Sequence, residues 1–286
     1  MFHFTKGSVI IMDTSSRLSG LERWLLVIPL LGGLVFGLLP LLVPAPFASF
    51  TGFPGNDPFI YRLAGAATFG YAVALILGMW QGTWAAVRLV VIAVLTFNLA
   101  SLYACGFEII SPSTTGVAKP VVYLILATSM IIVALTSTML YRHRTDARPA
   151  RTIASWVGAF LVIATILAFV FGLTPLFYPQ LNHLFGFKVT DLFLYRQAGA
   201  STLGYAMMGF FELRSRNWQE IRSPVVMAGV FNGLSFLVSL LTLALGEATL
   251  LPALVAVASF AVTVATIVVL RTRGGMPTRT QAAPLA

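Results

Sequence analysis

Long apolar blocks that exclude charged residues dominate this sequence. Residues 25–43, 121–140 and 254–270 are examples, and each is close to the ~20 residues that a helix needs to cross the hydrocarbon core of a bilayer. Hydrophobic residues make up 58% of the chain and charged residues 9%, whereas soluble domains are about 45–50% apolar and about a quarter charged. A water-soluble fold cannot bury that much apolar surface, so the sequence predicts an integral membrane protein surrounded by membrane lipids.

An internal repeat is the second constraint on the fold. The segment DPFIYRLAGAATFGY at 57–71 returns as DLFLYRQAGASTLGY at 191–205, an offset of 134 residues (191 − 57). At the same offset Trp84 matches Trp218, and Asn98 matches Asn232. Polar residues that stay in register across apolar sequence indicate a duplication.

The expected fold is an all-α membrane bundle of eight transmembrane helices in two tandem four-helix repeats. Because each repeat has an even number of spans, both have the same orientation and are related by a pseudo-two-fold axis along the membrane normal. The expected helices are 24–44, 58–80, 87–105, 119–141, 153–177, 190–212, 222–244 and 249–270. The chain then divides into an N-terminal segment 1–23, a first repeat 24–141, a basic linker 142–152, a second repeat 153–270 and a C-terminal tail 271–286.

Basic residues are concentrated on one side of this topology. The termini, the linker and the connections near Arg88 and Arg222 carry most of them, whereas the opposite loops hold only Lys119 and Lys188. By the positive-inside rule both termini are cytoplasmic. The same distribution accounts for the net charge of +9 without a nucleic-acid partner. The preference for Arg over Lys and the abundant Ala favour a bacterial source, so we expect a bacterial cytoplasmic (inner) membrane.

The repeated segment also supplies candidate binding residues. Arg62 and Arg196 lie about one turn, or ~6 Å, inside the outer ends of their spans. Their side chains can extend to the lipid headgroups, form ion pairs with the nearby aspartates, or bind an anion together with the preceding tyrosines. The full candidate site comprises Arg62, Arg196, Tyr61, Tyr195, Asn98, Asn232, Thr68, Thr202, Asp57 and Asp191.

The asparagines and threonines of this set lie deeper in the spans. A buried amide in hydrocarbon needs hydrogen-bond partners, and Thr68 or Thr202 lies at a depth similar to that of Asn98 or Asn232. We therefore expect these residues either to bind one helix to another or to line a cavity. The small residues around Gly65 and Gly199 predict close helix packing. The repeated pairs Trp84/Arg88 and Trp218/Arg222 predict anchors at the cytoplasmic interface.

No pattern of an enzyme, a metal site or a cofactor site is present. His3, His143 and His183 do not recur between the repeats and lie outside the spans, so nothing predicts an intramembrane bis-histidine haem site or a metal centre. Cys105 is the single cysteine, which excludes an intramolecular disulfide. The acidic residues are scattered, and glycine loops of the phosphate-binding type are missing. An enzymatic role is therefore disfavoured, and no cofactor is expected.

Two functional classes remain from the sequence. In the first, the protein binds or transports a small anionic or lipid-like molecule at the interface of its two repeats. In the second, it is a non-transporting membrane scaffold or accessory subunit, and the duplicated polar residues only join helices. A two-fold axis that a ligand could use favours the first class. The sequence indicates neither the ligand nor the oligomeric state.

Overall fold

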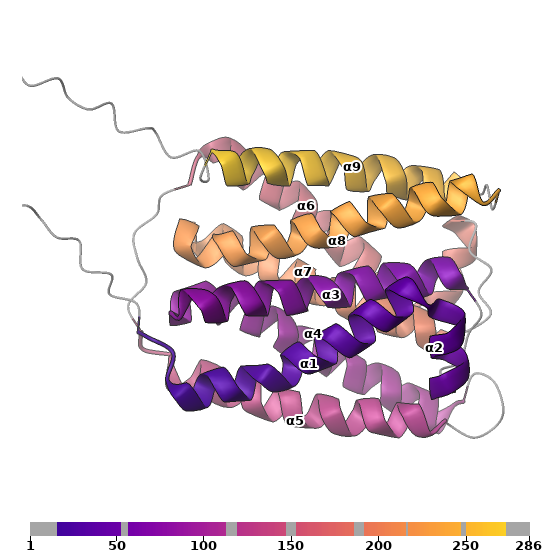
Figure 1. Ribbon diagram of the computed structural model, residues 1–286, viewed down its shortest axis with the longest axis horizontal. Helices are drawn as coiled ribbons and strands as arrows, with labels where there is room; N and C mark the ends of the chain where they lie inside the picture. Colours follow the sequence, from indigo (N-terminus) through magenta and orange to yellow (C-terminus); the bar gives the residue numbers. More distant parts are fainter. Residues whose placement is uncertain are drawn as a thin grey trace, which may run out of the picture.

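The computed structural model describes residues 16–52, 57–112, 119–146, 153–185, 192–215, 217–246 and 250–272. Within these ranges the chain forms a bundle of long helices (Figure 1). The α-helices are α1 Gly20–Leu42, α2 Pro44–Thr51, α3 Pro58–Gln81, α4 Trp84–Ile110, α5 Pro120–Arg142, α6 Ser155–Phe177, α7 Leu192–Ser215, α8 Trp218–Ala244 and α9 Leu250–Arg271, and a 3-10 helix, η1, spans Pro179–Phe185.

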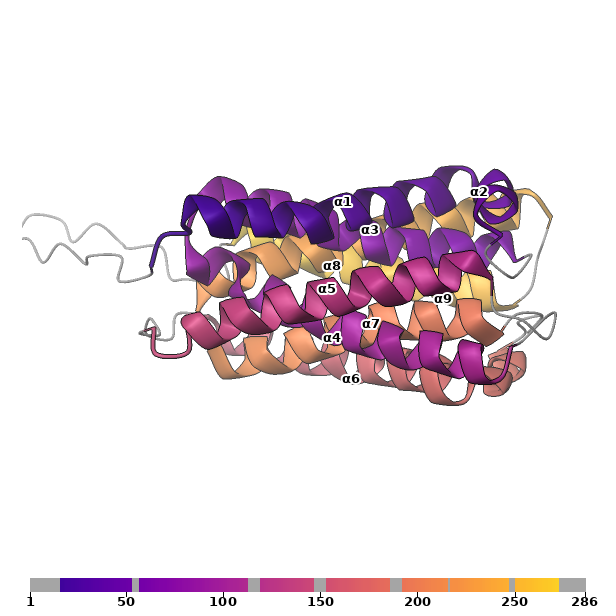
Figure 2. The same cartoon turned by 90° about the horizontal axis from the view of Figure 1, so that it is seen from below.

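Seven of the described helices, α1, α3, α4, α5, α6, α8 and α9, are long and apolar enough to cross a membrane. The chain is therefore an all-α, multi-pass integral membrane protein, as the apolar blocks predict. The helix α7 has 24 residues and lies alongside the others in the bundle (Figure 2). Arg196, Glu212 and Arg214 lower its mean hydropathy, so α7 is not among the seven.

The helix boundaries follow local chemistry. A capping box between Ser19 and Glu22 starts α1, because these side chains satisfy backbone N–H groups that have no partner within the helix. Asp57 caps α3 in the same way, accepting from the backbone N–H groups of Phe59 at 3.0 Å and Ile60 at 3.3 Å. The helix α2, within the first expected span and the loop after it, is not predicted from the sequence. It begins at Pro44, where the missing N–H ends the preceding helix and suits the first position of a new one.

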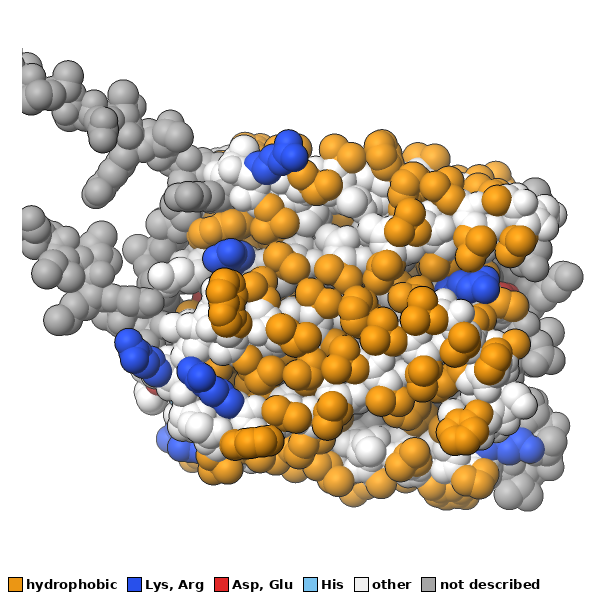
Figure 3. Space-filling view, viewed as in Figure 1, with side chains coloured by type: hydrophobic (Ala, Val, Ile, Leu, Met, Phe, Trp, Pro, Cys, Tyr) orange, Lys and Arg blue, Asp and Glu red, His pale blue; other side chains and the backbone are white. Residues whose placement is uncertain are grey.

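Among the described helices, α3, α4, α7 and α8 form the centre of the bundle, and α1, α5, α6 and α9 cover them (Figures 1 and 2). The helix α3 packs against α8 and α4 packs against α7, whereas α1, α5, α6 and α9 pack on α3, α4, α7 and α8, respectively. The covering helices turn large apolar side chains outward, for example Leu31, Ile163 and Val257. Hydrophobic side chains accordingly spread over the middle of the face in Figure 3, as expected of a surface in contact with lipid tails.

Arginines mark one end of the bundle, which we call the basic end. It is the end at which α1, α4, α6 and α8 begin and α3, α5, α7 and α9 finish (Figure 1). Arg88, Arg142, Arg214 and Arg271 belong to the helix turns at this end. The other end, with α2, η1 and Asp57, is the opposite end.

Glycines allow α1 to approach α3 and α6 to approach α7. A Cβ atom on Gly37 would lie 2.7 Å from the backbone nitrogen of Phe69, and one on Gly172 would lie 2.9 Å from that of Leu203. A Cβ atom on Gly65 would lie 2.7 Å from the carbonyl oxygen of Gly37. Backbone atoms cannot move away as a flexible side chain can, so the helix packing depends on these glycines.

Two tyrosines connect the centre of the bundle in a reciprocal arrangement. Tyr71 of α3 donates to the carbonyl oxygen of Ser201 on α7 at 2.6 Å, and Tyr205 of α7 donates to that of Ala67 on α3 at 2.7 Å. The two rings meet edge to face with centroids 5.1 Å apart. Because both hydroxyls are buried, each hydrogen bond replaces hydration that the interior cannot supply.

We expect Gly37→Ala to destabilise the protein by about 1–3 kcal/mol, because the added methyl group overpacks the contact between α1 and α3. Gly32→Ala on the same helix is the matched control, since a Cβ atom there meets nothing within 4 Å. Thermal unfolding of the purified variants in detergent measures both effects. Equal unfolding temperatures for the two variants would contradict the close approach.

We expect Tyr71→Phe and Tyr205→Phe each to lower the free energy of unfolding by about 1 kcal/mol, because each removes one buried hydrogen bond. Tyr123→Phe on α5 should leave it unchanged, since that side chain is exposed. The same unfolding assay applies. Wild-type stability of both buried variants would exclude a structural contribution from the reciprocal contact.

Candidate functional site

The opposite end brings two of the predicted site residues together. The Tyr195 hydroxyl of α7 lies 3.4 Å from the carboxylate of Asp57, which caps α3. Tyr195 and Tyr61 are both buried, and the Tyr61 ring packs edge to face against Phe47 of α2. Asp191, the repeat counterpart of Asp57, lies outside the described residues.

The two candidate arginines occupy different environments. Arg196 is buried, with 3% of its surface exposed, and its guanidinium lies 4.0 Å above the Phe107 ring of α4. Such stacking lets an aromatic face stabilise a cation away from water. Arg196 therefore lies inside the bundle and does not reach the headgroups. Arg62 is half-buried.

The predicted asparagines and threonines form hydrogen bonds within their own helices. The side chains of Thr68, Asn98, Thr202 and Asn232 each donate to the carbonyl oxygen four residues earlier, at 2.8–2.9 Å. This local bonding satisfies one donor of each side chain within its own helix. These four hydrogen bonds each join residues of the same helix and do not connect two helices.

A chain of polar contacts that the sequence analysis missed links α5, α4 and α7. The Ser129 hydroxyl lies 3.4 Å from that of Ser101, which donates to the side-chain oxygen of Gln197 at 2.9 Å. The Gln197 amide nitrogen lies 3.6 Å from the Cys105 sulfur. Leu63 stands at the position of Gln197 in the first copy, so a search for residues shared by both copies could not find this chain of contacts.

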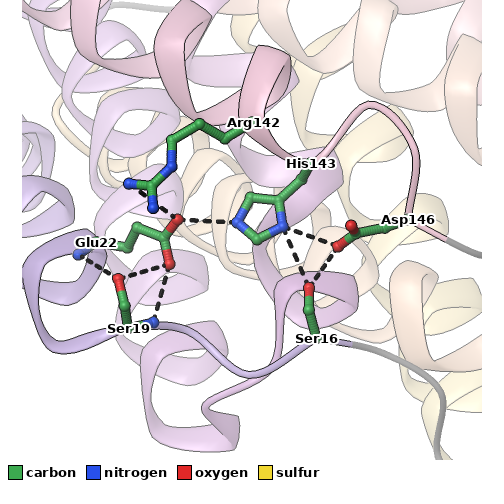
Figure 4. A network of polar contacts seen from close by, with 6 residues as sticks. All are labelled: Ser16, Ser19, Glu22, Arg142, His143 and Asp146. Atoms are coloured by element: carbon green, nitrogen blue, oxygen red, sulfur yellow. Dashed lines mark hydrogen bonds and ion pairs between the residues drawn. The ribbon is translucent and has the colours of Figure 1, made fainter.

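The basic end holds a second polar network, built around His143 at the end of α5 (Figure 4). The ring nitrogen Nε2 lies 2.9 Å from Glu22, and Nδ1 lies 2.8 Å from Asp146. The ring also stacks on Trp84 with centroids 4.3 Å apart. Arg142 lies 3.7 Å from the same Glu22 oxygen.

An ion pair joins α4 to α8 beside this network. Arg88 lies 3.0 Å from Glu220, whose side chain is 4% exposed, and the Ser215 hydroxyl donates to the same carboxylate. Trp84 is buried, so the prediction that it anchors the chain at the membrane interface is wrong. Its ring is enclosed between helices and stacks on His143 in place of contacting headgroups.

Two hollows lie near the basic end. A cavity of about 210 Å³ is lined by Ser16, Trp84, Arg88, His143, Asp146 and Glu220, among others. A groove between α3 and α8 is lined by Trp80, Trp218 and Arg222 with apolar neighbours. Of the predicted site residues, the nine that the structure describes line neither hollow. Their ligand-binding role stays a prediction.

The two described histidines are far apart. His143 precedes α6, and His183 follows it in η1, where its side chain is exposed. The 23 residues of α6 separate the two by roughly 34 Å at 1.5 Å per residue. The third histidine, His3, lies outside the described residues. Among the residues that the structure describes, no three His, Cys, Asp or Glu side chains form a group suited to a metal ion.

Comparison with known proteins gives one family match. The family described as eukaryotic cytochrome b561 matches residues 80–211, which is less than half of the 286 residues. No curated protein and no solved structure matches the chain. The matched region begins at the end of α3 and includes α4, α5, α6, η1 and most of α7.

This match corrects two predictions from the sequence. The function predicted above, a carrier or binding protein with a scaffold as the alternative, is contradicted, because the match points to an electron-transfer cytochrome. The family is described as eukaryotic, which also argues against a bacterial inner membrane.

The described residues do not fit a haem held between two histidines inside a span. Such a haem needs two imidazoles on opposite faces of one iron, but His143 and His183 lie at opposite ends of α6. Both nitrogens of His143 also face carboxylates. From the end of α3 into α7, the chain is similar to the eukaryotic cytochrome b561 family, and its described spans contain no histidine pair.

Proposed function

We propose that this protein takes part in electron transfer across a membrane. The observation that carries the proposal is the match of residues 80–211 with the eukaryotic cytochrome b561 family, since cytochromes are electron carriers. The matched helices also form one connected group in the bundle. The helix α5 packs on α4, α4 packs on α7, and α7 packs on α6.

The residues of this chain restrict how an electron carrier could be held. Because the described histidines do not form a pair, the proposal assigns no haem ligand and derives no step through haem. The matched helices instead offer the partly buried Ser101–Gln197 contact at 2.9 Å and the cation of Arg196 stacked on Phe107. A buried cation favours a negatively charged or electron-rich group nearby.

We expect the purified protein, expressed in a host supplied with haem precursor, to carry a chromophore that dithionite reduces and air reoxidises. A reduced-minus-oxidised absorption spectrum measures it, and a pyridine haemochrome assay identifies haem if that is the group. Protein that binds no redox-active group under these conditions would overturn the proposed electron transfer.

The double variant His143→Phe, His183→Asn tests whether binding of the electron carrier depends on the two described histidines. We expect it to keep the chromophore and its spectrum, because the two rings lie too far apart to share one iron. Loss of the chromophore from this variant, with its folding intact, would show that at least one of these histidines is a ligand.

We propose further that the chain has eight spans in two tandem repeats, 24–141 and 153–270, related by a pseudo-two-fold axis along the membrane normal. Segments 1–23, 142–152 and 271–286 then lie on the cytoplasmic side. Matching contacts support this proposal. Tyr71 and Tyr205 each donate a hydrogen bond to the backbone of the other's helix. The backbone of Phe69 approaches Gly37 closely, and that of Leu203 approaches Gly172 in the same manner.

The length of α7 supports an eighth span, since 24 residues reach about 36 Å at 1.5 Å per residue. Reporters fused after Ala286 or inserted near Arg148 should therefore read cytoplasmic, and reporters near Pro112 or Leu184 should read external. A C-terminal reporter on the external side would leave seven spans and would contradict the parallel repeats.

A further inference from the structure

The carboxyl group of Glu212 is buried near the basic end of α7. Only 3% of this residue's surface is exposed. Its oxygen Oε1 is enclosed and has no hydrogen-bond partner among the described residues, and none of the ion pairs found among them includes Glu212. An ionisable side chain is costly to bury in a transmembrane bundle, so Glu212 is a candidate for a functional group.

A hydroxyl group that also lacks a partner lies on the neighbouring helix. Thr165 of α6 is buried, and its hydroxyl has no hydrogen-bond partner in the described part of the chain. This hydroxyl lies against Gly209 of α7, in space that a Cβ atom would otherwise fill. Glu212 follows Gly209 by three residues, so both lie on one face of α7, about 4.5 Å apart along the helix. The contact between α6 and α7 therefore contains a carboxyl group and a hydroxyl group about one turn apart.

The corresponding positions of the proposed first repeat are apolar. At the offset of 134 residues, Gly78 stands at the position of Glu212 (212 − 134 = 78). Gly37 and Gly172, which make the matching close approaches, are 135 residues apart, and at that offset Leu30 stands at the position of Thr165 (165 − 135 = 30). Glycine and leucine therefore suffice for packing at these positions, and filling space does not explain the carboxyl and hydroxyl groups.

The helices α6 and α3 bring no charge to this end of α7, although both pack against it. The helix α6 contains no charged or titratable residue along Ser155–Phe177. In α3 there is none after Tyr71, whose hydroxyl donates to the backbone of Ser201. Neither helix supplies a cation to a carboxylate at Glu212.

The helices α4 and α8 bring charged groups that are engaged elsewhere. Arg88 of α4 and Glu220 of α8 form an ion pair with each other at 3.0 Å, and α4 has no further titratable residue before Tyr103. Arg222 of α8 is exposed and lines the groove between α3 and α8. Arg214, on α7 itself, is exposed and lies over the Phe210 ring. Among the described residues, no ion pair therefore compensates a negative charge on Glu212.

We propose that Glu212 is a proton-binding site of the bundle and that its carboxyl group is protonated in the folded protein at neutral pH. Burying an isolated carboxylate costs so much free energy that the group takes up a proton and becomes neutral. A protonated carboxyl group has one O–H donor, and a threonine oxygen can accept a hydrogen bond. The Thr165 hydroxyl is the partner that the α6–α7 contact offers. The site is separate from the proposed electron transfer and does not depend on it.

Dicyclohexylcarbodiimide tests for the proton, because this apolar reagent enters membrane proteins and reacts with protonated carboxyl groups. The carboxyl proton passes to one carbodiimide nitrogen while the carboxyl oxygen bonds to the central carbon. Transfer of the acyl group from that oxygen to the other nitrogen then leaves a stable N-acylurea, and no atom is lost. Mass spectrometry of peptides from the labelled full-length protein locates the adduct.

At neutral pH we expect modification of Glu212 to be at least about tenfold faster than that of Glu220, which Arg88 holds as a carboxylate. Glu212→Gln should abolish this adduct, whereas the control Glu220→Gln should keep it. Modification of other carboxyl groups with Glu212 unmodified would overturn the proposal. Protection of Glu212 by excess NaCl in place of choline chloride would also overturn it, because the site would then bind a metal cation.

Thermal unfolding gives a second test that does not require the reagent to reach the site. Glu212→Gln keeps the shape of the protonated acid but cannot ionise. A proton that only the folded state holds makes wild-type stability fall, relative to this variant, as pH rises above the range in which an exposed glutamate titrates. The unfolding temperature of Glu212→Gln minus that of wild type should therefore increase from about pH 5 to about pH 7. A difference that stays constant or decreases would reject the proton site. Neither measurement depends on a bound electron carrier.

Discussion

Polar groups inside a bilayer must find their partners within the protein, and this constraint shapes the whole structure. Thr68, Asn98, Thr202 and Asn232 meet it by bonding to their own helices. Tyr71 and Tyr205 meet it by donating to the backbone of each other's helix. Bonds within one helix do not connect it to another helix. The two tyrosine bonds, in contrast, fix how α3 and α7 lie against each other. The reciprocal tyrosine contact therefore determines the centre on which the outer helices pack.

The contacts between helices differ along the length of the bundle. Its middle is held by small residues, since glycines such as Gly37 and Gly172 let backbones approach where no hydrophobic driving force acts between helices and lipid. Ionic contacts occur near the ends, where water reduces the cost of charge. At the basic end, the pair of Arg88 and Glu220 joins α4 to α8, and His143 joins the end of α5 to the start of α1.

Similarity to the cytochrome family and the positions of the histidines give different information about function. The matched region forms one connected group of helices, which agrees with a shared framework. The two described histidines of the matched region lie at the ends of its long helices, one engaged with two carboxylates and one exposed. A helical framework depends on packing, which many apolar side chains can supply. A cofactor site requires particular ligands at one place. Electron transfer is therefore inferred from the framework, and the carrier has to be established by spectroscopy.

The sequence by itself determined that the chain is an all-α membrane protein, because blocks such as 121–140 exclude charge over the length of a span. It also located the long helices to within a few residues, since hydropathy and proline are local signals. Only the tertiary structure decided which polar residues meet. Nothing in the sequence places Glu22 beside His143 or buries Arg196 against Phe107, because these contacts join residues far apart in the chain. These pairs depend on how the helices pack against one another. Packing depends on the shapes of the side chains at every contact, and the hydrophobic pattern of the sequence does not specify those shapes.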